Sequence, residues 1–248
     1  MKKLIICIIM PFILFSAINV SADTISLATT NWEPFFGEEL PENGFFAALS
    51  REAFKRAGYE MKIRFLPWKR AMVMAEGGQY DGLLGAYHND QRAEKFHFTD
   101  SIFQNDTVFI QKKGRGITYT KIEDLKRYII GTHRGTGAET ELLQKAMNID
   151  SVADNIMNLK KLYADRIDLL IMSKPAFYYK IYNIEELKQY KGGFDIIDPP
   201  YKRYEIYNAI SKNTDGGEKI VSRFNNALRS MKEDGSYDKI LDRFKQDH

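Results

Sequence analysis

The sequence has almost no cysteine, and its single one, Cys7, lies near the N-terminus inside an apolar stretch. Beyond that point no disulfide, no thiolate metal site and no cysteine nucleophile can form. Cys7 also lies far upstream of the cleavage point predicted below, which excludes a lipid-modified cysteine at a new N-terminus. A chain of 248 residues can bury a hydrophobic core without disulfides or structural metal sites, either as one large domain or as two small ones.

Long apolar runs are equally scarce, and the longest opens the chain. It covers residues 4–18 and is about 15 residues long, whereas a membrane span needs roughly 20. Lys2 and Lys3 precede it, and the small residues Ser21 and Ala22 follow it. This layout is typical of a secretory signal peptide. We therefore expect residues 1–22 to be removed and the mature chain to begin at Asp23, with an uncleaved membrane anchor as the alternative.

The chain also lacks an excess of charge of either sign. Its formal net charge is +3, which falls to +1 without Lys2 and Lys3. This balance gives no reason to expect nucleic acid or an anionic membrane as a partner. Ser/His/Asp elbows and phosphate loops are absent. Metal-ligand spacing is absent among the four histidines, which are His88, His97, His133 and His248. The sequence therefore predicts no metal, no cofactor and no nucleic-acid partner.

Strand and helix patterns alternate in the first part of the mature chain. Apolar residues recur with a period of two in the predicted strands and at helical spacing in the predicted helices. The strands cover residues 25–29, 61–65 and 80–84, and the helices cover 44–57 and 67–75. Gly58 ends the first helix and Pro67 begins the second. This alternation builds a parallel sheet with helices on its faces.

A second alternating unit follows, and the chain closes with two helices. The predicted strands cover residues 108–111, 128–132, 167–172, 194–197 and 205–210, and Pro199 and Pro200 are expected to end the fourth. The predicted helices cover residues 137–147, 153–163 and 175–182, followed by 220–231 and 237–244. Two successive α/β units indicate an α/β protein with two lobes.

Short local sequences, in a fixed order, resemble the bacterial extracellular solute-binding proteins of family 3, the amino-acid-type receptors of ABC importers. The resemblance covers essentially all of the mature chain. One departure is Ser101-Ile102-Phe103, which replaces the usual proline and tyrosine. The matching segments are Trp32-Glu33-Pro34-Phe35, Gly44-Phe45, residues 78–82, Arg92 with residues 96–100, residues 122–125, residues 130–137, Arg166-Ile167-Asp168 and residues 234–238.

The resemblance implies the fold and its division. It implies the type II periplasmic-binding-protein fold, in which each lobe is a mainly parallel sheet flanked by helices. Lobe 1 would comprise residues 23–104 plus 206–248, and lobe 2 residues 105–205. Two hinge strands, near residues 105–111 and 204–210, would join the lobes, and a ligand would lie in the cleft between them.

Arg92 is the residue that the resemblance singles out first, because the matching arginine of the family binds the ligand's carboxylate. Two parallel donors of a guanidinium match the two oxygens of a carboxylate. Trp32, in the loop after the first strand, could cover a ligand's apolar stem or stack on a cation. Tyr87 stands where many relatives carry a hydroxyl that bonds the ligand.

Further candidates lie at two predicted helix starts. Gly135 and Thr136 precede the helix at 137–147, where main-chain N–H groups attract an anion, and Arg134 could add a cation there or remain exposed. Trp68, at the start of the helix at 67–75, could touch the ligand or belong to the core.

Ser173 is the main departure from the family's amino-acid receptors. They usually place an acid at the matching position, where it binds the ligand's α-ammonium. A serine cannot neutralise that charge, and burying an unpaired charge is costly. Either another acid substitutes, with Glu33 and Asp106 as candidates, or the ligand is not an ordinary α-amino acid.

The resemblance implies a function without catalysis. We expect a monomeric periplasmic protein that binds a small polar, carboxylate-bearing molecule and presents it to an ABC permease in the inner membrane. One alternative is a periplasmic enzyme on the same fold that resembles cyclohexadienyl dehydratase, for which Glu33 and His133 would be the acid–base candidates. Another is the ligand-binding partner of a membrane sensor.

Overall fold

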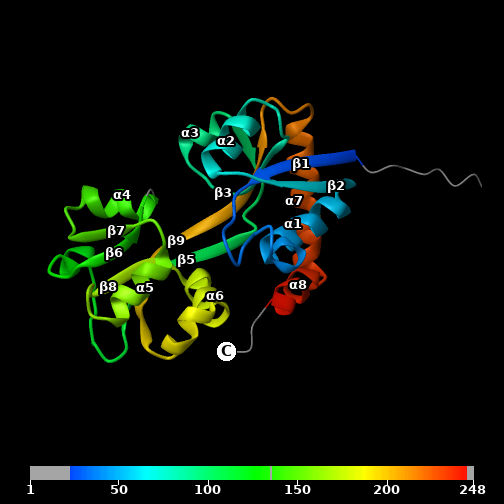
Figure 1. The fold of residues 1–248 in the computed structure, drawn as a ribbon. Coiled ribbons are helices and arrows are strands. Elements are labelled where there is room, and N and C mark those ends of the chain that lie inside the picture. The colour runs from blue at the N-terminus through cyan, green and yellow to red at the C-terminus, as the bar shows by residue number, and fades with distance from the viewer. Residues whose placement is uncertain (1–22, 135, 245–248) are drawn as a thin grey trace, which may run out of the picture.

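The computed structural model describes residues 23–134 and 136–244. Figure 1 shows two groups of helices and strands joined by two long strands, β5 (Phe103–Lys112) and β9 (Phe194–Ser211). These two strands pair antiparallel, from Phe103 opposite Ile206 to Lys112 opposite Phe194. The predicted signal peptide of residues 1–22 lies outside the described residues.

The first group is built around strand β1 (Asp23–Thr29), which pairs in parallel with a strand on each side. Helix α1 (Phe45–Arg56) buries eight of its twelve residues, whereas α2 (Trp68–Glu76) buries Ala71 and Ala75. The other elements of this group are β2 (Tyr59–Phe65), β3 (Gly82–Tyr87), β4 (Phe96–Phe98), α1 (Phe45–Arg56), α2 (Trp68–Glu76), α3 (Asp90–Ala93) and a 3-10 turn at Pro41–Asn43.

The second group repeats this construction around β6 (Ile130–His133), which pairs in parallel with a strand on each side. One of these, β8 (Leu169–Ser173), also pairs antiparallel with β5 and so attaches the group to the long strands. The remaining elements are β7 (Ile149–Val152), α4 (Gly137–Gln144), α5 (Asn155–Tyr163), α6 (Lys174–Asn183) and 3-10 turns at Ile122–Leu125 and Glu185–Tyr190.

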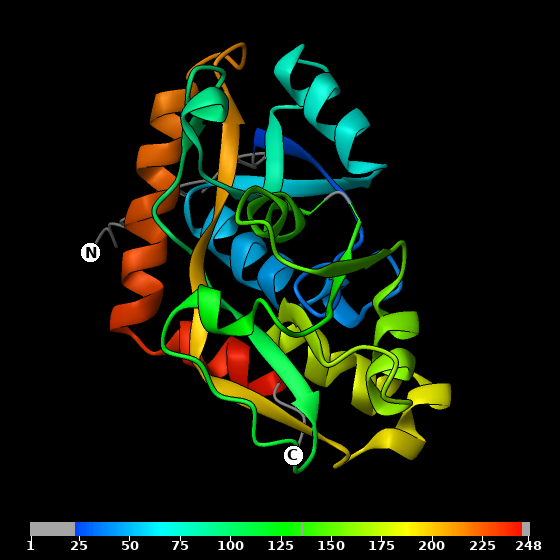
Figure 2. The ribbon, with the colours of Figure 1, turned by 90° about the vertical axis from the view of Figure 1, so that its left-hand side faces the viewer.

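The C-terminal helices α7 (Gly217–Glu233) and α8 (Ser236–Phe244) pack on α1 of the first group (Figures 1 and 2). The rings of Phe54 and Phe224 lie 4.6 Å apart in this contact. Over the described residues the sheet has the strand order β2-β1-β3-β9-β5-β8-β6-β7, with β4 paired to β9. The predicted lobe boundaries at 104/105 and 205/206 fall within β5 and β9, and the division itself stays a prediction.

Two predictions of secondary structure are wrong. The strand predicted to end at Pro199 and Pro200 continues as β9 to Ser211, because the register shifts there: Thr107 lies opposite Lys202 but Phe109 lies opposite Ile197. Proline is tolerated at such a bulge, where no ladder N–H is needed. The helix predicted at 137–147 ends at Gln144, and the strand β7 follows it unpredicted.

Within residues 23–134 and 136–244, the model contains no helix with both the length and the apolar character of a bilayer span.

Candidate ligand-binding site

Trp32 lies at the centre of an aromatic cluster after β1. Its ring centroid is 4.3 Å from that of Phe35, 5.7 Å from that of Phe36 and 5.6 Å from that of Tyr87. Main-chain hydrogen bonds in both directions join Trp32 to Phe36 and hold the loop as a tight turn. Phe35 and Phe36 are fully buried, whereas Trp32 keeps part of its surface exposed. The loop therefore anchors itself in the core and leaves the indole available at its edge.

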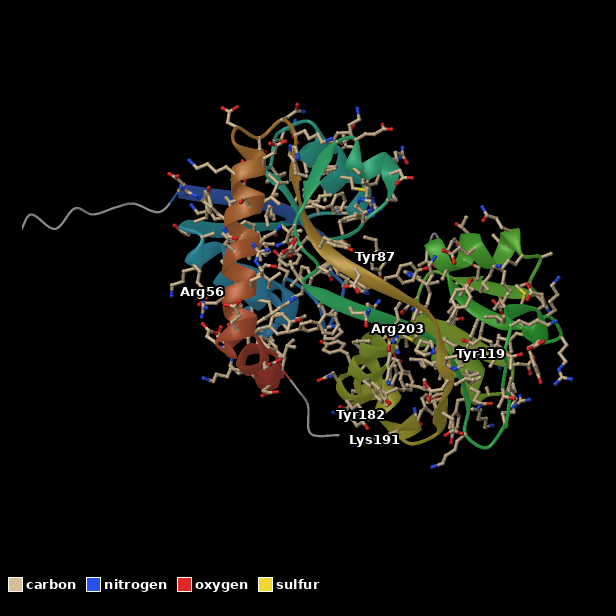
Figure 3. The ribbon with its side chains drawn as sticks, turned by 180° about the vertical axis from the view of Figure 1, so that it is seen from behind. Arg56, Tyr87, Tyr119, Tyr182, Lys191 and Arg203 are labelled. Carbon is tan, nitrogen blue, oxygen red and sulfur yellow. The ribbon has the colours of Figure 1, made fainter. Side chains whose placement is uncertain are left out.

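Tyr87, the last residue of β3, joins this cluster to the two long strands. Its ring stacks on that of Tyr204 in β9, with centroids 4.8 Å apart and planes 28° apart. Figure 3 labels Tyr87 beside the long strand β9. Its hydroxyl accepts a hydrogen bond of 2.9 Å from Nδ2 of Asn105 in β5. Burial raises the pKa of Tyr87 well above its ordinary value, although the Asn105 donor opposes the shift. The phenol is therefore neutral at physiological pH.

Arg92, in the short helix α3, lies against the same tyrosine. Its Nη1 donates to the main-chain oxygen of Tyr87 at 2.7 Å, and its guanidinium carbon lies 5.5 Å from the ring centroid of Trp68. Asn89 caps the helix by accepting from the main-chain N–H of Arg92 at 2.8 Å. Burial lowers the pKa of Arg92. Among the described residues no carboxylate forms an ion pair with this half-buried cation.

Trp68 makes contacts both with the core and with Arg92. It packs against the small buried cluster under α2 that contains Ala71 and Leu83, and it also presents its ring to Arg92. Trp68 is thus packed against the core and also contacts Arg92, and its contact with a ligand stays a prediction. A cation held over an indole is favourable and leaves the guanidinium edge free to bind another group.

Ser173 ends β8 and caps α6, and its side chain is engaged by the protein. Its hydroxyl donates to Oδ1 of Asn105 at 2.7 Å and accepts a long, 3.5 Å hydrogen bond from the main-chain N–H of Ala176. Asn105 is fully buried and thus links Ser173 of β8 to Tyr87 of β3. Asn105 was not among the residues predicted from the sequence, although a polar residue next to the apolar run of a predicted hinge strand was an available signal.

Arg134 and Thr136 lie at the start of α4 and not in this cluster. Thr136 caps the helix, donating to the main-chain oxygen of His133 at 2.8 Å and accepting from the N–H of Glu139 at 3.3 Å. Arg134 is exposed and donates to the main-chain oxygen of Ser151 at 3.1 Å. Gly135 lies outside the described residues. Within the described chain, no hydrogen bond, ion pair or ring contact joins Arg134 or Thr136 to the other predicted site residues.

Glu141 connects α4 to the aromatic cluster indirectly. Its carboxylate accepts from Lys202 Nζ at 2.6 Å, from the Tyr201 hydroxyl at 3.2 Å and from the Tyr204 hydroxyl at 3.3 Å. Burial alone would raise the pKa of Glu141, but Lys202 and the two phenols outweigh it and hold the pKa below its ordinary value. Because Tyr204 also stacks on Tyr87, its side chain bridges the two groups of elements.

The two acids proposed as substitutes at the amine position differ in availability. Asp106 is paired with Arg203, with Oδ1 3.0 Å from Nε. Glu33 is half-buried in the Trp32 loop. Burial and, after it, the charge of Glu33 raise the pKa of Tyr179, a residue of α6.

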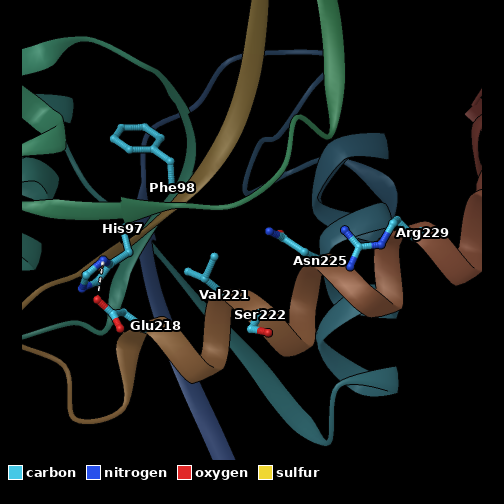
Figure 4. Close-up of a pocket in the computed structure, with 7 residues that line it drawn as sticks. All are labelled: His97, Phe98, Glu218, Val221, Ser222, Asn225 and Arg229. Carbon is cyan, nitrogen blue, oxygen red and sulfur yellow. Dashed lines mark ion pairs between the residues drawn. The ribbon is translucent and has the colours of Figure 1, made fainter.

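A separate hollow of about 360 Å³ lies between β4 and α7, and Figure 4 shows the side chains around it. His97 Nδ1 lies 4.0 Å from a carboxylate oxygen of Glu218, and Arg229 on the same helix pairs with Asp100 at 3.1 Å. None of the predicted site residues lines this hollow. Among the described residues, no group of three or more His, Cys, Asp and Glu side chains is arranged to hold a metal ion.

Comparisons with known proteins agree with the architecture. The model of the bacterial extracellular solute-binding proteins, family 3, matches residues 26–247. The arginine-binding extracellular protein ArtP of Bacillus subtilis is 24% identical over 205 residues, which cover 79% of this chain and 75% of the relative.

Two solved structures share the fold. The glutamate-bound GluR0 ligand-binding core from Nostoc punctiforme aligns with a TM-score of 0.68 at 19% identity, covering 89% of this chain and 97% of that one. An ancestral amino acid-binding protein described as a precursor of cyclohexadienyl dehydratase aligns with a TM-score of 0.67 at 19% identity, covering 90% and 95%. These likenesses confirm the fold class predicted from the sequence.

Proposed function

The chain belongs to the bacterial extracellular solute-binding proteins, family 3, and from that premise we propose that it captures a small carboxylate-bearing molecule for an ABC importer. It would act as a monomer, without catalysis, and would present the loaded form to a permease in the inner membrane. The ligand would lie between lobe 1 and lobe 2 and pull them together by contacts with both.

One observation carries this proposal, namely the half-buried guanidinium of Arg92 with no carboxylate partner among the described residues. Burying a cation without a counter-charge is costly, so a ligand that supplies an anion gains affinity from the site. The main-chain oxygen of Tyr87 and the ring of Trp68 hold the guanidinium in place before a ligand arrives. A prepositioned fork loses little entropy when it binds a carboxylate.

The other candidates have supporting roles in the proposal. Trp32 would cover the ligand's apolar part, and Tyr87 would bond it through the hydroxyl. The start of α4, with Arg134, Gly135 and Thr136, would contact the ligand's anionic side once the lobes close. Tyr204 contacts elements on both sides of the proposed hinge, namely Tyr87 and Glu141.

The identity of the ligand is narrowed by Ser173. Relatives include proteins named for binding arginine and histidine, and an amino acid is the default for this chain. Ser173, however, is neutral and already bonded to Asn105. We therefore propose a carboxylate that lacks a free α-ammonium. Of the two acids predicted as substitutes, Glu33 is the candidate to hold a cation, since Asp106 is paired with Arg203.

We expect the predicted signal peptide to direct the protein to the periplasm. N-terminal sequencing of material released from the periplasm tests this, and the expected first residue is Asp23. A membrane-bound form that retains Lys2 and Lys3 would contradict it.

The enzyme alternative has less support. His133, one of its two acid–base candidates, has Nε2 2.7 Å from the main-chain oxygen of Ala153 and is engaged there. In the second alternative, the protein would bind its ligand in the same site. Its closed, ligand-bound form would then bind a membrane sensor instead of an ABC permease.

Native mass spectrometry of freshly purified protein, followed by a thermal-shift screen, tests the function. A ligand that binds the folded state raises the melting temperature by mass action. We expect a co-purifying carboxylate whose removal lowers the melting temperature, and Arg92→Ala should abolish its retention. A retained ligand without an acidic group would overturn the carboxylate assignment, and turnover of the ligand would favour the enzyme.

A further inference from the structure

Asn105 is a fully buried amide with a different partner on each end, and both partners are predicted site residues. Its Oδ1 accepts from the Ser173 hydroxyl at 2.7 Å, and its Nδ2 donates to the Tyr87 hydroxyl at 2.9 Å. The oxygen of an amide accepts hydrogen bonds and its NH2 group donates them. Of two hydroxyls bonded to opposite ends of the amide, one must therefore donate and the other must accept. The direction of the hydrogen bonds along this chain is therefore fixed by one residue.

This direction determines what each hydroxyl has left to offer. Tyr87 accepts from Asn105 and donates to no acceptor among the described residues, so its proton is free. The raised pKa of Tyr87 keeps that proton in place at physiological pH. The Ser173 hydroxyl donates its proton to Asn105 and accepts from the N–H of Ala176 with one lone pair. It can therefore offer a ligand only its remaining lone pair, as an acceptor.

The environment of each hydroxyl agrees with this assignment. Arg92 donates to the main-chain oxygen of Tyr87, so the residue that carries the free phenol proton is also in contact with a cation. Both favour an anion. Ser173 lies at the N-terminus of α6 without a charged partner among the described residues. It offers a neutral acceptor and no counter-charge.

We propose that Asn105 is a specificity-determining residue that acts through Tyr87 and Ser173, and that the site takes carboxylates whose neighbouring group is a neutral hydrogen-bond donor. A 2-hydroxy acid or an N-acylated amino acid has this pattern, whereas an α-amino acid carries a charge that Ser173 cannot balance. The inference rests on the proposed function in taking Tyr87 and Ser173 as ligand contacts.

The first test concerns the hydrogen-bond direction and needs no ligand. In Raman spectra the tyrosine doublet distinguishes a phenol that accepts from one that donates, and the difference between wild type and Tyr87→Phe isolates Tyr87. We expect the spectrum of an accepting phenol in wild type. In Ser173→Ala this accepting signature should weaken, because the Asn105 amide loses its hydrogen bond from the Ser173 hydroxyl and is no longer held in one orientation. In Asn105→Asp both hydroxyls face acceptor oxygens, so Tyr87 should become a donor. A donating phenol in wild type would overturn the proposal.

The second test uses three matched probes, phenyllactate, 3-phenylpropionate and phenylalanine, which differ only in a hydroxyl, a hydrogen or an ammonium at one carbon. We expect wild type to prefer phenyllactate to 3-phenylpropionate by about tenfold, the worth of one hydrogen bond, and Ser173→Ala to abolish that preference. Equal binding of the two acids, or tightest binding of phenylalanine, would overturn the proposal. Failure of all three to bind would instead count against the carboxylate assignment, while the Raman result stands separately.

Discussion

Arg92 donates from Nη1 to the main-chain oxygen of Tyr87 across 2.7 Å, and this contact ties the proposed carboxylate anchor to the end of β3. The hydrogen bond uses one edge of the guanidinium. The remaining donors stay available for a ligand, because no carboxylate among the described residues pairs with them. The anchor is thus held by a residue that also belongs to the aromatic cluster.

Replacement of Arg92 should therefore weaken ligand binding strongly. Loss of one partner of a buried, charge-assisted pair costs about 2–5 kcal/mol, or roughly thirtyfold and more in affinity. Arg92→Lys should also lose affinity, since an ammonium does not reproduce the planar fork. Calorimetry with the co-purifying ligand measures both variants. Arg115→Ala, which removes an arginine paired with Asp165 and Asp168, is the control, and unchanged affinity in Arg92→Ala would remove Arg92 from the site.

Common α-amino acids should bind weakly. Ser173 supplies no charge, and its proton is already given to Asn105, so an ammonium in the closed site would lose water and gain too little. Calorimetry of the ligand-stripped protein against the standard amino acids checks this. Ser173→Asp should improve binding of at least one of them by about tenfold or more. Submicromolar binding by the wild type that persists in Glu33→Gln would show that the missing acid is irrelevant.

Much of the fold followed from the sequence, because the apolar periodicity of strands and helices and the glycines that end helices are local features. The long strand β9 did not, since Pro199 and Pro200 suggested an end and only pairing with β5 reveals that they occupy a bulge. A bulge depends on the partner strand and leaves no local pattern.

The contacts within the candidate site were predicted in part for a similar reason, and the roles of its residues in ligand binding stay predictions. Trp32, Tyr87 and Arg92 come together as contacts, and each had a motif or a position to mark it. Asn105 had no family motif, and its polar position at a predicted hinge strand did not reveal that it meets Tyr87 and Ser173, which are 18 and 68 residues away along the chain. Long-range side-chain pairing of this kind is a property of the folded topology and not of a sequence window.

Gly85 should not tolerate a side chain. It adopts a φ of +74° within the irregular pairing of β3 and β9, and a Cβ there would lie 2.2 Å from the ring of Phe36. Gly114 has a similar φ of +82° with no atom within 4 Å, so it isolates the cost of the backbone strain. We expect Gly85→Ala to lower the free energy of unfolding by about 1–3 kcal/mol more than Gly114→Ala does. Denaturant titrations of both variants measure this difference. Equal losses would show that Phe36 moves aside freely.

Acid should loosen the contact between α4 and β9. Glu141 accepts from Lys202, Tyr201 and Tyr204, and these partners hold its pKa below the ordinary value of 4.5. A carboxyl whose pKa is depressed in the folded state stabilises the protein above its unfolded value, and this contribution is lost as the pH falls through the folded value. The loss should therefore occur below about pH 4.5 and be about 1 kcal/mol or less, since the group is partly exposed.

Glu141→Gln tests this reasoning, because it removes the titrating group and keeps its size. The variant should be less stable than wild type at neutral pH, and the difference should shrink as the pH falls below about 4.5. Glu60→Gln, at an exposed glutamate of β2 with no hydrogen bond or ion pair among the described residues, is the matched control and should show no such convergence.

Tyr204→Phe tests whether Tyr204 takes part in this contact. Tyr204 and Glu141 share a hydrogen bond, so the stability losses of the two single variants should not add, and Tyr204→Phe should reduce the effect of Glu141→Gln. Parallel pH profiles for wild type and Glu141→Gln would mean that the carboxylate does not couple α4 to the long strand.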